Sequence, residues 1–290
     1  MTAVLDEETA LSCVFEKVPD KGIFRELMRT LADNRTVIRL CFHSASLSVE
    51  HACMIGTVLA KNKCIQVLNL NENYDLGDAG VHALAQGLVQ NSSVLEVLLE
   101  NGNVRANGAR SLACCLTTNK TIIRLFLPYN SISDDGLGSN TSLKEGSLPP
   151  INSFAIGLGD CLQFNNTLQE LNLDGNEVTA KGAEFLSTSL ARNSSLRILS
   201  LARNNVEDKG ASHFANALRE NSSLMTLNLR NNKIGMPGAF NLLNTIISDN
   251  TTLKTLVLQD LVFRVNGEGT SILRGYVEKI DNLGRCNVEF

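Results

Sequence analysis

The chain has 290 residues, which is enough for one large domain or two ordinary ones, and 43% of its residues are hydrophobic. The formal net charge is −4, and no stripe of Lys and Arg marks a surface for nucleic acid or for a membrane. We therefore expect neither nucleic acid nor membrane as a partner.

The N-terminal segment carries no targeting signal that we can identify. Residues 1–8 include three acidic side chains and no apolar stretch typical of a signal peptide. No apolar run in the chain reaches the roughly 18 residues that a bilayer-spanning helix needs. The eight cysteines form no CxxC pair, which favours reduced thiols. We expect an intracellular, cytoplasmic protein, and association with the cytoskeleton or the cilium stays open.

Residues 37–258 contain eight copies of one pattern, which the segment from Leu168 to Asn176 shows clearly. The copies start at Val37, Ile65, Val94, Ile122, Leu168, Leu196, Leu224 and Leu253. Successive starts lie 28 or 29 residues apart, except for the 46 residues between Ile122 and Leu168, which equal one repeat plus 18 residues. A fixed period of this length indicates a repeat architecture.

Each position of the repeat has a physical role, counted from the first apolar residue as position 0. Apolar residues at positions 0, 3 and 5 predict a short strand with one buried face. Asn at position 8 closes the strand, and its amide can bond to backbone in the turn and in the neighbouring repeat. Gly at position 14 starts a closely packed helix, and apolar residues at positions 18 and 22 fall on one helix face.

Eight Asn-x-Ser/Thr sequons occur, and seven of them stand at the same place, just before a strand. Those seven are Asn34, Asn91, Asn119, Asn165, Asn193, Asn221 and Asn250, and the eighth is Asn140. Because Asn tolerates the left-handed backbone conformation in which many helices end, we expect a structural role at this place, not glycosylation.

One strand–helix unit cannot bury its apolar face alone, but stacked units share a continuous core. The predicted fold is therefore an α/β curved solenoid, or horseshoe, with a parallel β-sheet on the concave face and helices on the convex face. Residues 1–36 are predicted to form an N-terminal cap with a half repeat, and residues 259–290 a C-terminal cap helix. Ile272, Tyr276, Ile280 and Leu283 are expected to form the apolar face of this amphipathic cap helix.

The 28-residue unit, with Gly before a full helix and an Asn-x-Ser/Thr-Leu restart, resembles the ribonuclease-inhibitor-like subfamily of leucine-rich repeats over about residues 20–290. Similar units occur in Ran GTPase-activating protein, NOD-like receptors, tropomodulin and ciliary proteins. The resemblance implies the fold, whereas function depends on the individual site. The chain has few cysteines, no Trp and no evident alternation of two repeat types, so inhibition of ribonuclease is not expected.

The predicted binding surface lies on the concave face, where the residues at positions 2, 4 and 6 of each strand point away from the core. Its apolar centre is Leu98, Phe126, Pro128 and Tyr129, and its charged rim is Glu96, Glu100, Arg124, Glu170 and Asp174. An apolar centre with a polar rim is typical of an interface. The alternative is ordinary packing beneath the insertion.

The inserted residues 137–154 are rich in Ser, Gly, Asn and Pro and predict a loop. We expect this loop to leave the rim beside Phe126 and Tyr129 and to take part in binding. The alternative is a tolerated surface insertion without a role.

No arrangement of residues predicts catalysis. Cys41 and His43 share one side of a strand, but no third group orients them and no further metal ligand is evident. The chain has no phosphate-binding GK[ST] loop, and we expect no cofactor, metal or catalytic residue. The function predicted is a non-enzymatic scaffold that binds a protein partner with basic and apolar groups, as a monomer or as a subunit of a larger complex.

Two alternative functions stay open. One is a GTPase-activating protein of the Ran type, for which Arg105 and Arg203 near strand ends are weak candidates for the functional arginine. The other is a structural subunit of a ciliary or cytoskeletal assembly.

Overall fold

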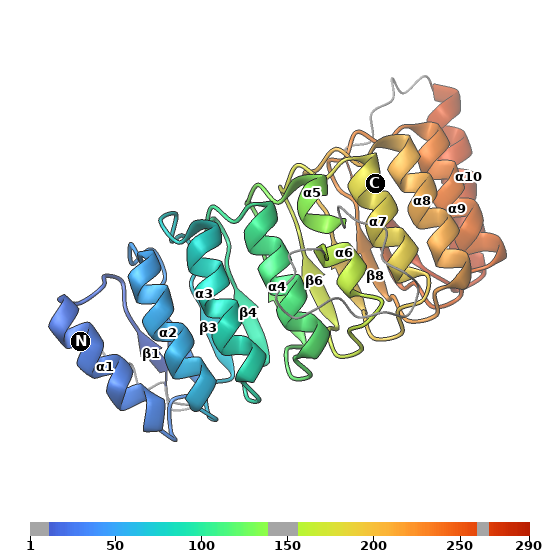
Figure 1. Cartoon of the computed structure of the whole chain (residues 1–290). Coiled ribbons are helices and arrows are strands. Elements are labelled where there is room, and N and C mark those ends of the chain that lie inside the picture. The colour runs from blue at the N-terminus through green and yellow to red at the C-terminus, as the bar shows by residue number, and fades with distance from the viewer. Residues whose placement is uncertain (1–11, 139–155, 260–266) are drawn as a thin grey trace.

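A computed structural model of the protein describes residues 12–138, 156–259 and 267–290 (Figure 1). Side chains are described for all of these except residues 267–271. Within these ranges, strands and helices alternate along the chain, as the repeat pattern predicts.

The strands form one ten-stranded sheet in which every strand lies beside its neighbour in sequence. They are β1 (Ser12–Val14), β2 (Arg39–Cys41), β3 (Val67–Asn69), β4 (Glu96–Leu98), β5 (Arg124–Phe126), β6 (Glu170–Asn172), β7 (Ile198–Ser200), β8 (Thr226–Asn228), β9 (Thr255–Val257) and β10 (Asn287–Glu289). All neighbouring pairs are parallel. Parallel pairing requires a crossover between strands, and the helices supply it.

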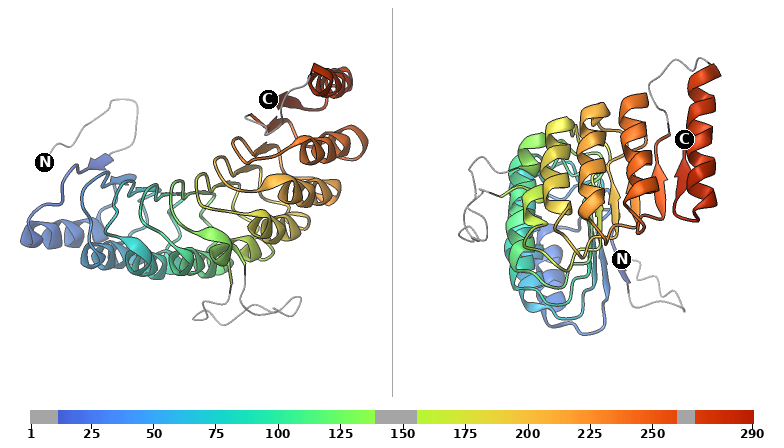
Figure 2. Two further views of the ribbon diagram at one scale, coloured as in Figure 1. Left: turned by 90° about the horizontal axis from the view of Figure 1, so that it is seen from above. Right: turned by 90° about the vertical axis from the view of Figure 1, so that its right-hand side faces the viewer.

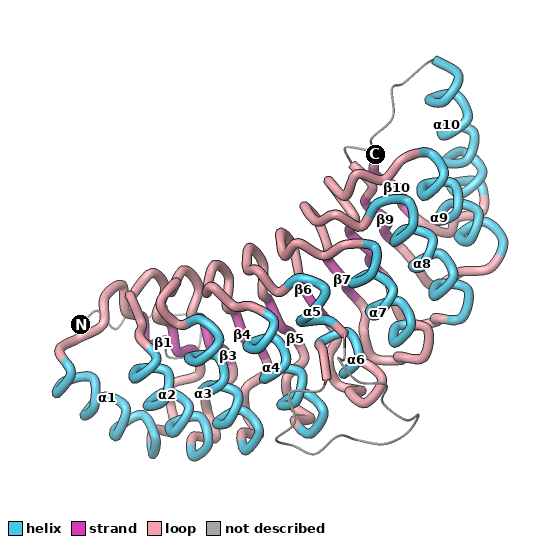
Figure 3. The backbone as a smooth tube through the Cα atoms, turned by 45° about the horizontal axis from the view of Figure 1, so that its top comes forward, coloured by secondary structure: helices cyan, strands magenta, loops and turns pink. Residues whose placement is uncertain are grey.

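The helices cover one face of this sheet and leave the other face open. They are α1 (Lys21–Asp33), α2 (Val49–Lys61), α3 (Gly77–Gln90), α4 (Ala106–Thr118), α5 (Ser133–Leu137), α6 (Leu158–Cys161), α7 (Ala180–Leu190), α8 (Glu207–Glu220), α9 (Met236–Ser248) and α10 (Gly267–Asn282). Figures 2 and 3 show the resulting arc, with the strands on its inner side and the helices on its outer side. The predicted α/β solenoid, concave on the strand side, is confirmed.

The core lies between the two layers and runs through all repeats. Leu171 and Leu173 at strand positions 3 and 5, and Leu186 and Leu190 at helix positions 18 and 22, all have no exposed surface. The equivalent residues of other repeats join them in one continuous apolar cluster. Burying a Leu side chain contributes about 1.5–3 kcal/mol, so these repeated layers supply the main driving force for folding.

The insertion interrupts the helix of its repeat after the first turns. Helix α5 ends at Leu137, and α6 begins at Leu158. When the 18 extra residues are subtracted, Leu158 and Leu162 fall on positions 18 and 22, and each is only 1% exposed. The repeat therefore fills its core normally after the insertion, of which residues 139–155 lie outside the described part of the chain.

Asparagines at the helix-to-strand turns form a ladder that joins successive repeats. Asn193 donates through Nδ2 to the carbonyl oxygens of Leu162 at 2.8 Å and Asn165 at 3.0 Å. Its Oδ1 accepts the N–H groups of Ser195 at 3.0 Å and Leu196 at 2.7 Å. Equivalent bonds recur at Asn62, Asn91, Asn119, Asn221 and Asn250.

The expected left-handed conformation of these asparagines is wrong. Asn119 ends α4 with φ −67° and ψ 131°, and Asn221 ends α8 with φ −74° and ψ 129°, which is extended backbone. Asn is needed for its side chain, since only an amide of this length can both donate to the preceding turn and accept from its own. The Nδ2 atom, to which a glycan would be attached, donates a buried bond to a carbonyl oxygen in Asn91, Asn119, Asn165, Asn193, Asn221 and Asn250.

A second correction concerns the repeats, which do alternate between two turn geometries. In one type the residue before the helix has right-handed helical backbone angles, and the first residue of the helix has a positive φ. Ile132 and Ser133 (φ 54°) are an example. In the other type the helix follows an extended residue, as at Thr179. The first type occurs at α3, α5 and α8 and the second at α2, α4, α7 and α9.

The two turn types alternate because a side chain of the first type caps the helix of the second. In the first type an Asp follows the positive-φ residue and caps the helix of the next repeat. Asp134 Oδ1 accepts the N–H groups of Thr179 at 2.8 Å and Gly182 at 3.0 Å. Asp78 and Asp208 do the same for α4 and α9. Carboxylates satisfy helix N–H groups that lack a partner inside the helix.

The C-terminal cap contains more than the predicted helix. After α10, strand β10 returns to pair with β9 and extends the sheet by one strand. In α10, Ile280 is fully buried but Ile272 is 50% exposed, and Leu283, which follows the helix, is 47% exposed. The predicted apolar face is therefore wrong for Ile272 and Leu283. Tyr276 packs against Phe240 of α9 with ring centroids 5.1 Å apart.

Candidate partner-binding site

The predicted site residues come together on β4, β5 and β6, at the centre of the concave face. Glu96, Arg124 and Glu170 stand opposite one another on the three strands. Leu98 and Phe126 form the next row. Position 3 of each of these strands is buried, so positions 2 and 4 must face the concave side.

In the charged row of Glu96, Arg124 and Glu170, the first two residues form an ion pair and Glu170 takes no part in it. Arg124 donates from Nε to Glu96 Oε2 at 2.8 Å, and its Nη2 lies 2.7 Å from the same oxygen. Among the described residues, Glu170 has no hydrogen bond or ion pair at these distances. Partial burial raises the pKa of Glu170, the charge of Arg124 opposes this rise, and Glu96 adds to it. Glu170 is therefore a carboxylate that a cation from outside could stabilise.

The apolar row is smaller than the sequence predicts. Leu98 and Phe126 are partly exposed beside each other, but Pro128 is buried, so the expectation that Pro128 offers exposed surface is wrong. The reason is the strand-to-helix turn, in which the carbonyl oxygen of Pro128 accepts the N–H of Asn101 of the preceding repeat at 3.1 Å.

Tyr129 is exposed at the end of this row, with 46% of its surface accessible. Its backbone has φ 53°, in the left-handed region, and its N–H donates to the carbonyl oxygen of Asp174 at 2.7 Å. The ring lies over Gly175, where a Cβ atom would approach Tyr129 Cδ1 to 2.8 Å. The absence of a side chain at Gly175 therefore determines where the Tyr129 ring rests.

The two remaining carboxylates of the predicted rim differ in their role. Asp174 Oδ1 accepts the Ser200 hydroxyl at 2.6 Å and the Ala202 N–H at 2.7 Å, so it joins β6 to the next repeat. Burial raises the pKa of Asp174 although these hydrogen bonds oppose the rise. Glu100 has no hydrogen bond from its side chain to any described residue and is half-buried. Glu100 is thus available to a partner, whereas Asp174 is engaged.

The insertion does not leave the protein beside Phe126 and Tyr129, and that expectation is wrong. Its described ends are Gly138 after α5 and Ile156 before α6, in the helix layer on the convex side (Figure 2). The ends meet, because the backbone of Gly157 lies against that of Leu137. The strand face and the described ends of the insertion therefore lie on opposite sides of the arc.

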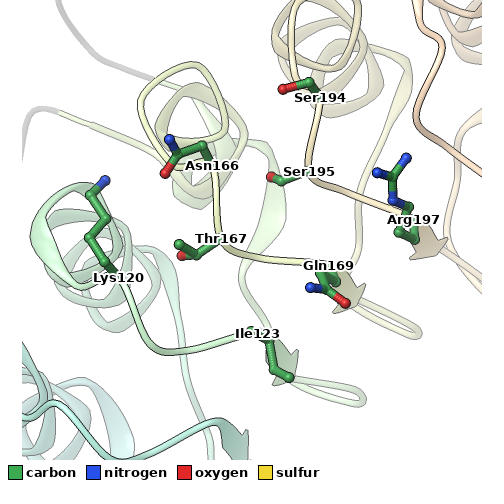
Figure 4. Close-up of a pocket in the computed structure, with 8 residues that line it drawn as sticks. All are labelled: Lys120, Ile123, Asn166, Thr167, Gln169, Ser194, Ser195 and Arg197. Carbon is green, nitrogen blue, oxygen red and sulfur yellow. The ribbon is translucent and has the colours of Figure 1, made fainter.

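A polar pocket that the sequence pattern does not reveal lies at the helix-to-strand turns that precede β5, β6 and β7. Figure 4 shows its lining, with Lys120 and Arg197 on opposite sides and the hydroxyls of Thr167 and Ser195 between them. The pocket has a volume of about 340 Å³. Three consecutive repeats contribute residues at the same positions, a signal that is readable from the sequence only after the repeats are stacked.

Cys41 and His43 are the residues that the sequence singles out as a candidate reactive pair or as candidate metal ligands. No group of three or more His, Cys, Asp or Glu side chains there could hold a metal ion. Burial raises the pKa of the Cys41 thiol, which disfavours the reactive thiolate. His43 lies 3.9 Å from Glu72, not paired with the thiol. No described helix is long and apolar enough to cross a membrane.

The comparison with protein families decides the class. The family of leucine-rich repeats, described as "Leucine Rich repeat", matches residues 61–85, 164–187, 192–215 and 220–243. The chain thus carries leucine-rich repeats and is similar to proteins of the ribonuclease-inhibitor-like kind. Domains of this class generally bind other proteins and are generally not enzymes.

Curated relatives match parts of this leucine-rich-repeat protein. It is 33% identical over 175 residues to leucine-rich repeat-containing protein 45 of Gallus gallus, covering 60% of this chain and 23% of that protein. It is 32% identical over 151 residues to ribonuclease inhibitor of Sus scrofa, covering 47% and 32%. It is 28% identical over 200 residues to protein CARMIL of Dictyostelium discoideum, covering 61% and 19%. The chain thus spans about a third or less of the length of these relatives.

Proposed function

We propose that this protein is a non-enzymatic scaffold that binds a partner protein through the concave face at β4–β6. The observation that supports this most strongly is the Glu170 carboxylate, which has no hydrogen-bond partner in the described chain and stands beside the partly exposed Leu98–Phe126 row. A partner that offers a basic side chain to Glu170 and an apolar side chain to Phe126 fits this surface.

The physical gain from such a contact has two sources. A Lys or Arg of the partner would form a charge-assisted hydrogen bond with Glu170, which is stronger than a neutral one. Covering Leu98, Phe126 and Tyr129 would remove apolar surface from water. The strands are held in place by the core beneath them, so little ordering is required before binding.

Affinity capture from native lysate tests the proposal. We compare the wild type with Phe126→Ala/Tyr129→Ala and with the control Val257→Ala/Met225→Ala, which removes apolar side chains from β9 and from the residue that precedes β8. Equal urea midpoints establish that each variant folds. Loss of one partner with the first variant alone supports the proposal, and the partner names the function. Capture of the same partners by all three proteins contradicts it.

Activation of a GTPase is a second proposal, because Arg105 and Arg203 are both exposed near strand ends. An arginine supplied in trans can stabilise the charge that develops during phosphoryl transfer. Single-turnover GTP hydrolysis by small GTPases, with Arg105→Ala and Arg203→Ala as controls, tests it. No acceleration by the wild type rejects it. A structural role in a ciliary or cytoskeletal assembly would instead be seen by imaging the tagged protein.

A further inference from the structure

The polar pocket of Figure 4 carries positive charge without a carboxylate to neutralise it. Lys120 donates from Nζ to the carbonyl oxygens of Thr117 at 3.2 Å and Phe164 at 3.4 Å. Arg197 donates from Nη1 to the carbonyl oxygen of Ser223 at 2.8 Å. In the described chain neither side chain has an ion pair, and no Asp or Glu lines the pocket. An anion is therefore the ligand that this pocket would attract.

The pocket also holds hydrogen-bond donors that the protein barely uses. The hydroxyls of Thr167 and Ser195 lie 3.4 Å from asparagine Oδ1 atoms, well beyond the usual O–H···O length of about 2.7–2.8 Å. They accept only long bonds, of 3.2 and 3.3 Å, from the Nδ2 atoms of the same asparagines. The side chains of Asn166, Gln169 and Ser194 have no hydrogen bond to any described residue. These groups can turn towards a ligand without breaking a strong bond.

The backbone around the pocket is fixed in advance by the asparagine ladder. Asn165 Oδ1 accepts the N–H groups of Thr167 at 3.0 Å and Leu168 at 2.7 Å. Asn193 holds the next turn in the same way. Both amides are buried, so the turns that carry the pocket donors are rigid. A preformed site loses little entropy on binding, which favours even a small ligand.

We propose that this pocket binds the phosphate monoester of a phosphorylated Ser or Thr side chain on a partner protein. A phosphate monoester carries nearly two charges and three acceptor oxygens, and it matches two flanking cations with several hydroxyl and amide donors better than a carboxylate does. The volume of about 340 Å³ accommodates the phosphate and the adjoining side chain. A membrane headgroup fits less well, because lipid surfaces are held by clusters of four to eight basic residues.

The chain provides a closely matched control. Lys63 stands at the repeat position of Lys120 and also donates to a carbonyl oxygen of the next repeat, that of Gln90 at 3.3 Å, but it does not line the pocket. Lys254 stands at the repeat position of Arg197, likewise outside the pocket lining. Lys63→Gln/Lys254→Gln therefore removes the same charge from the same kind of turn as Lys120→Gln/Arg197→Gln.

The experiment measures binding to the full chain by fluorescence anisotropy at low and physiological salt. The probes are a degenerate peptide pool with one fixed phosphoserine or phosphothreonine, the same pool without phosphate, and vesicles that contain phosphatidylinositol 4-phosphate; inorganic phosphate serves as competitor. We expect the phosphorylated pool to bind the wild type and inorganic phosphate to compete. We expect at least about tenfold weaker binding by Lys120→Gln/Arg197→Gln and unchanged binding by the control.

Three results overturn the proposal. The first is equal binding of the phosphorylated and unphosphorylated pools. The second is an equal loss of binding in both double variants. The third is binding of the vesicles or of free phosphate alone. The Phe126→Ala/Tyr129→Ala variant is expected to bind the phosphorylated pool normally, since its substitutions lie on the concave face. Failure of the phosphate site and failure of the proposed concave site are thus seen in different variants.

Discussion

The carboxylate of Asp134 accepts the backbone N–H of Gly182 at 3.0 Å, across 48 residues of sequence that include the insertion. The same carboxylate accepts the Thr179 N–H and hydroxyl, so one side chain caps the helix α7 of the next repeat. This contact joins the two parts of the solenoid that the insertion separates in sequence.

Replacing Asp134 by Ala is expected to lower the free energy of unfolding by about 1–2 kcal/mol, as for other helix caps. The measurement is urea denaturation followed by circular dichroism. The control is Asp135→Ala, because that exposed side chain makes no hydrogen bond to any described residue. Equal loss in the two variants would show that the cap contributes nothing.

Replacing Asn193 by Ala removes four hydrogen bonds to backbone groups at once and leaves two carbonyl oxygens and two N–H groups without this partner. With a net value of about 1 kcal/mol for each bond, we expect a loss of about 3–4 kcal/mol in the same urea assay. The neighbouring Asn166 is exposed and outside the ladder, so Asn166→Ala should change stability little. An unchanged midpoint for Asn193→Ala would contradict the ladder as a source of stability.

Replacing Gly87 by Ala should destabilise the protein by about 2–3 kcal/mol, because a Cβ atom there would collide with the backbone of Gly56 in the adjoining helix. In α10, Gly275 has open space around its Cβ position. Gly275→Ala should therefore stabilise the helix slightly, by about 0.5–1 kcal/mol. Thermal unfolding of both variants measures the contrast, and a tolerated Gly87→Ala would mean that α2 and α3 can separate easily.

The thiols should differ sharply in reactivity. Burial raises the pKa of Cys115 to about 12 and also raises that of Cys161, so almost no thiolate exists at either residue at pH 8. Cys53 is exposed. We expect iodoacetamide at pH 8 to modify Cys53 in the native protein and to spare the two buried thiols until urea is added. Mass spectrometry locates the label, and native modification of Cys115 at the rate of Cys53 would exclude this packing.

Glu170 should make stability depend on pH in a specific direction. Because its pKa is raised on folding, the folded chain holds the proton more tightly than the unfolded chain does. The resulting penalty is fully present above the folded pKa and disappears as the pH falls below the ordinary value of 4.5. Glu170→Gln should therefore raise the urea midpoint at pH 7 relative to wild type and leave it nearly equal at pH 4. A lower midpoint at pH 7 would show a stabilising partner for the carboxylate.

The sequence alone was sufficient for the architecture. The apolar positions 0, 3, 5, 18 and 22 recur with a fixed period, and each needs the neighbouring repeat to cover it, so only a stacked parallel solenoid satisfies them all. Even the resumption of the helix at Leu158 and Leu162 follows from subtracting 18 residues. The assignment of positions 2 and 4 of β4–β6 to the concave face also follows from alternation along a strand.

Tertiary structure decided what those residues contact. The burial of Pro128, the bonds that occupy Asp174 and the freedom of Glu170 depend on neighbours at least 26 residues away in sequence. The insertion leaves from the convex side because it splits a helix, which its loop-like composition did not reveal. Periodicity specifies the face on which a side chain lies, whereas accessibility, charge partners and the phosphate-sized pocket depend on how three successive turns meet in space.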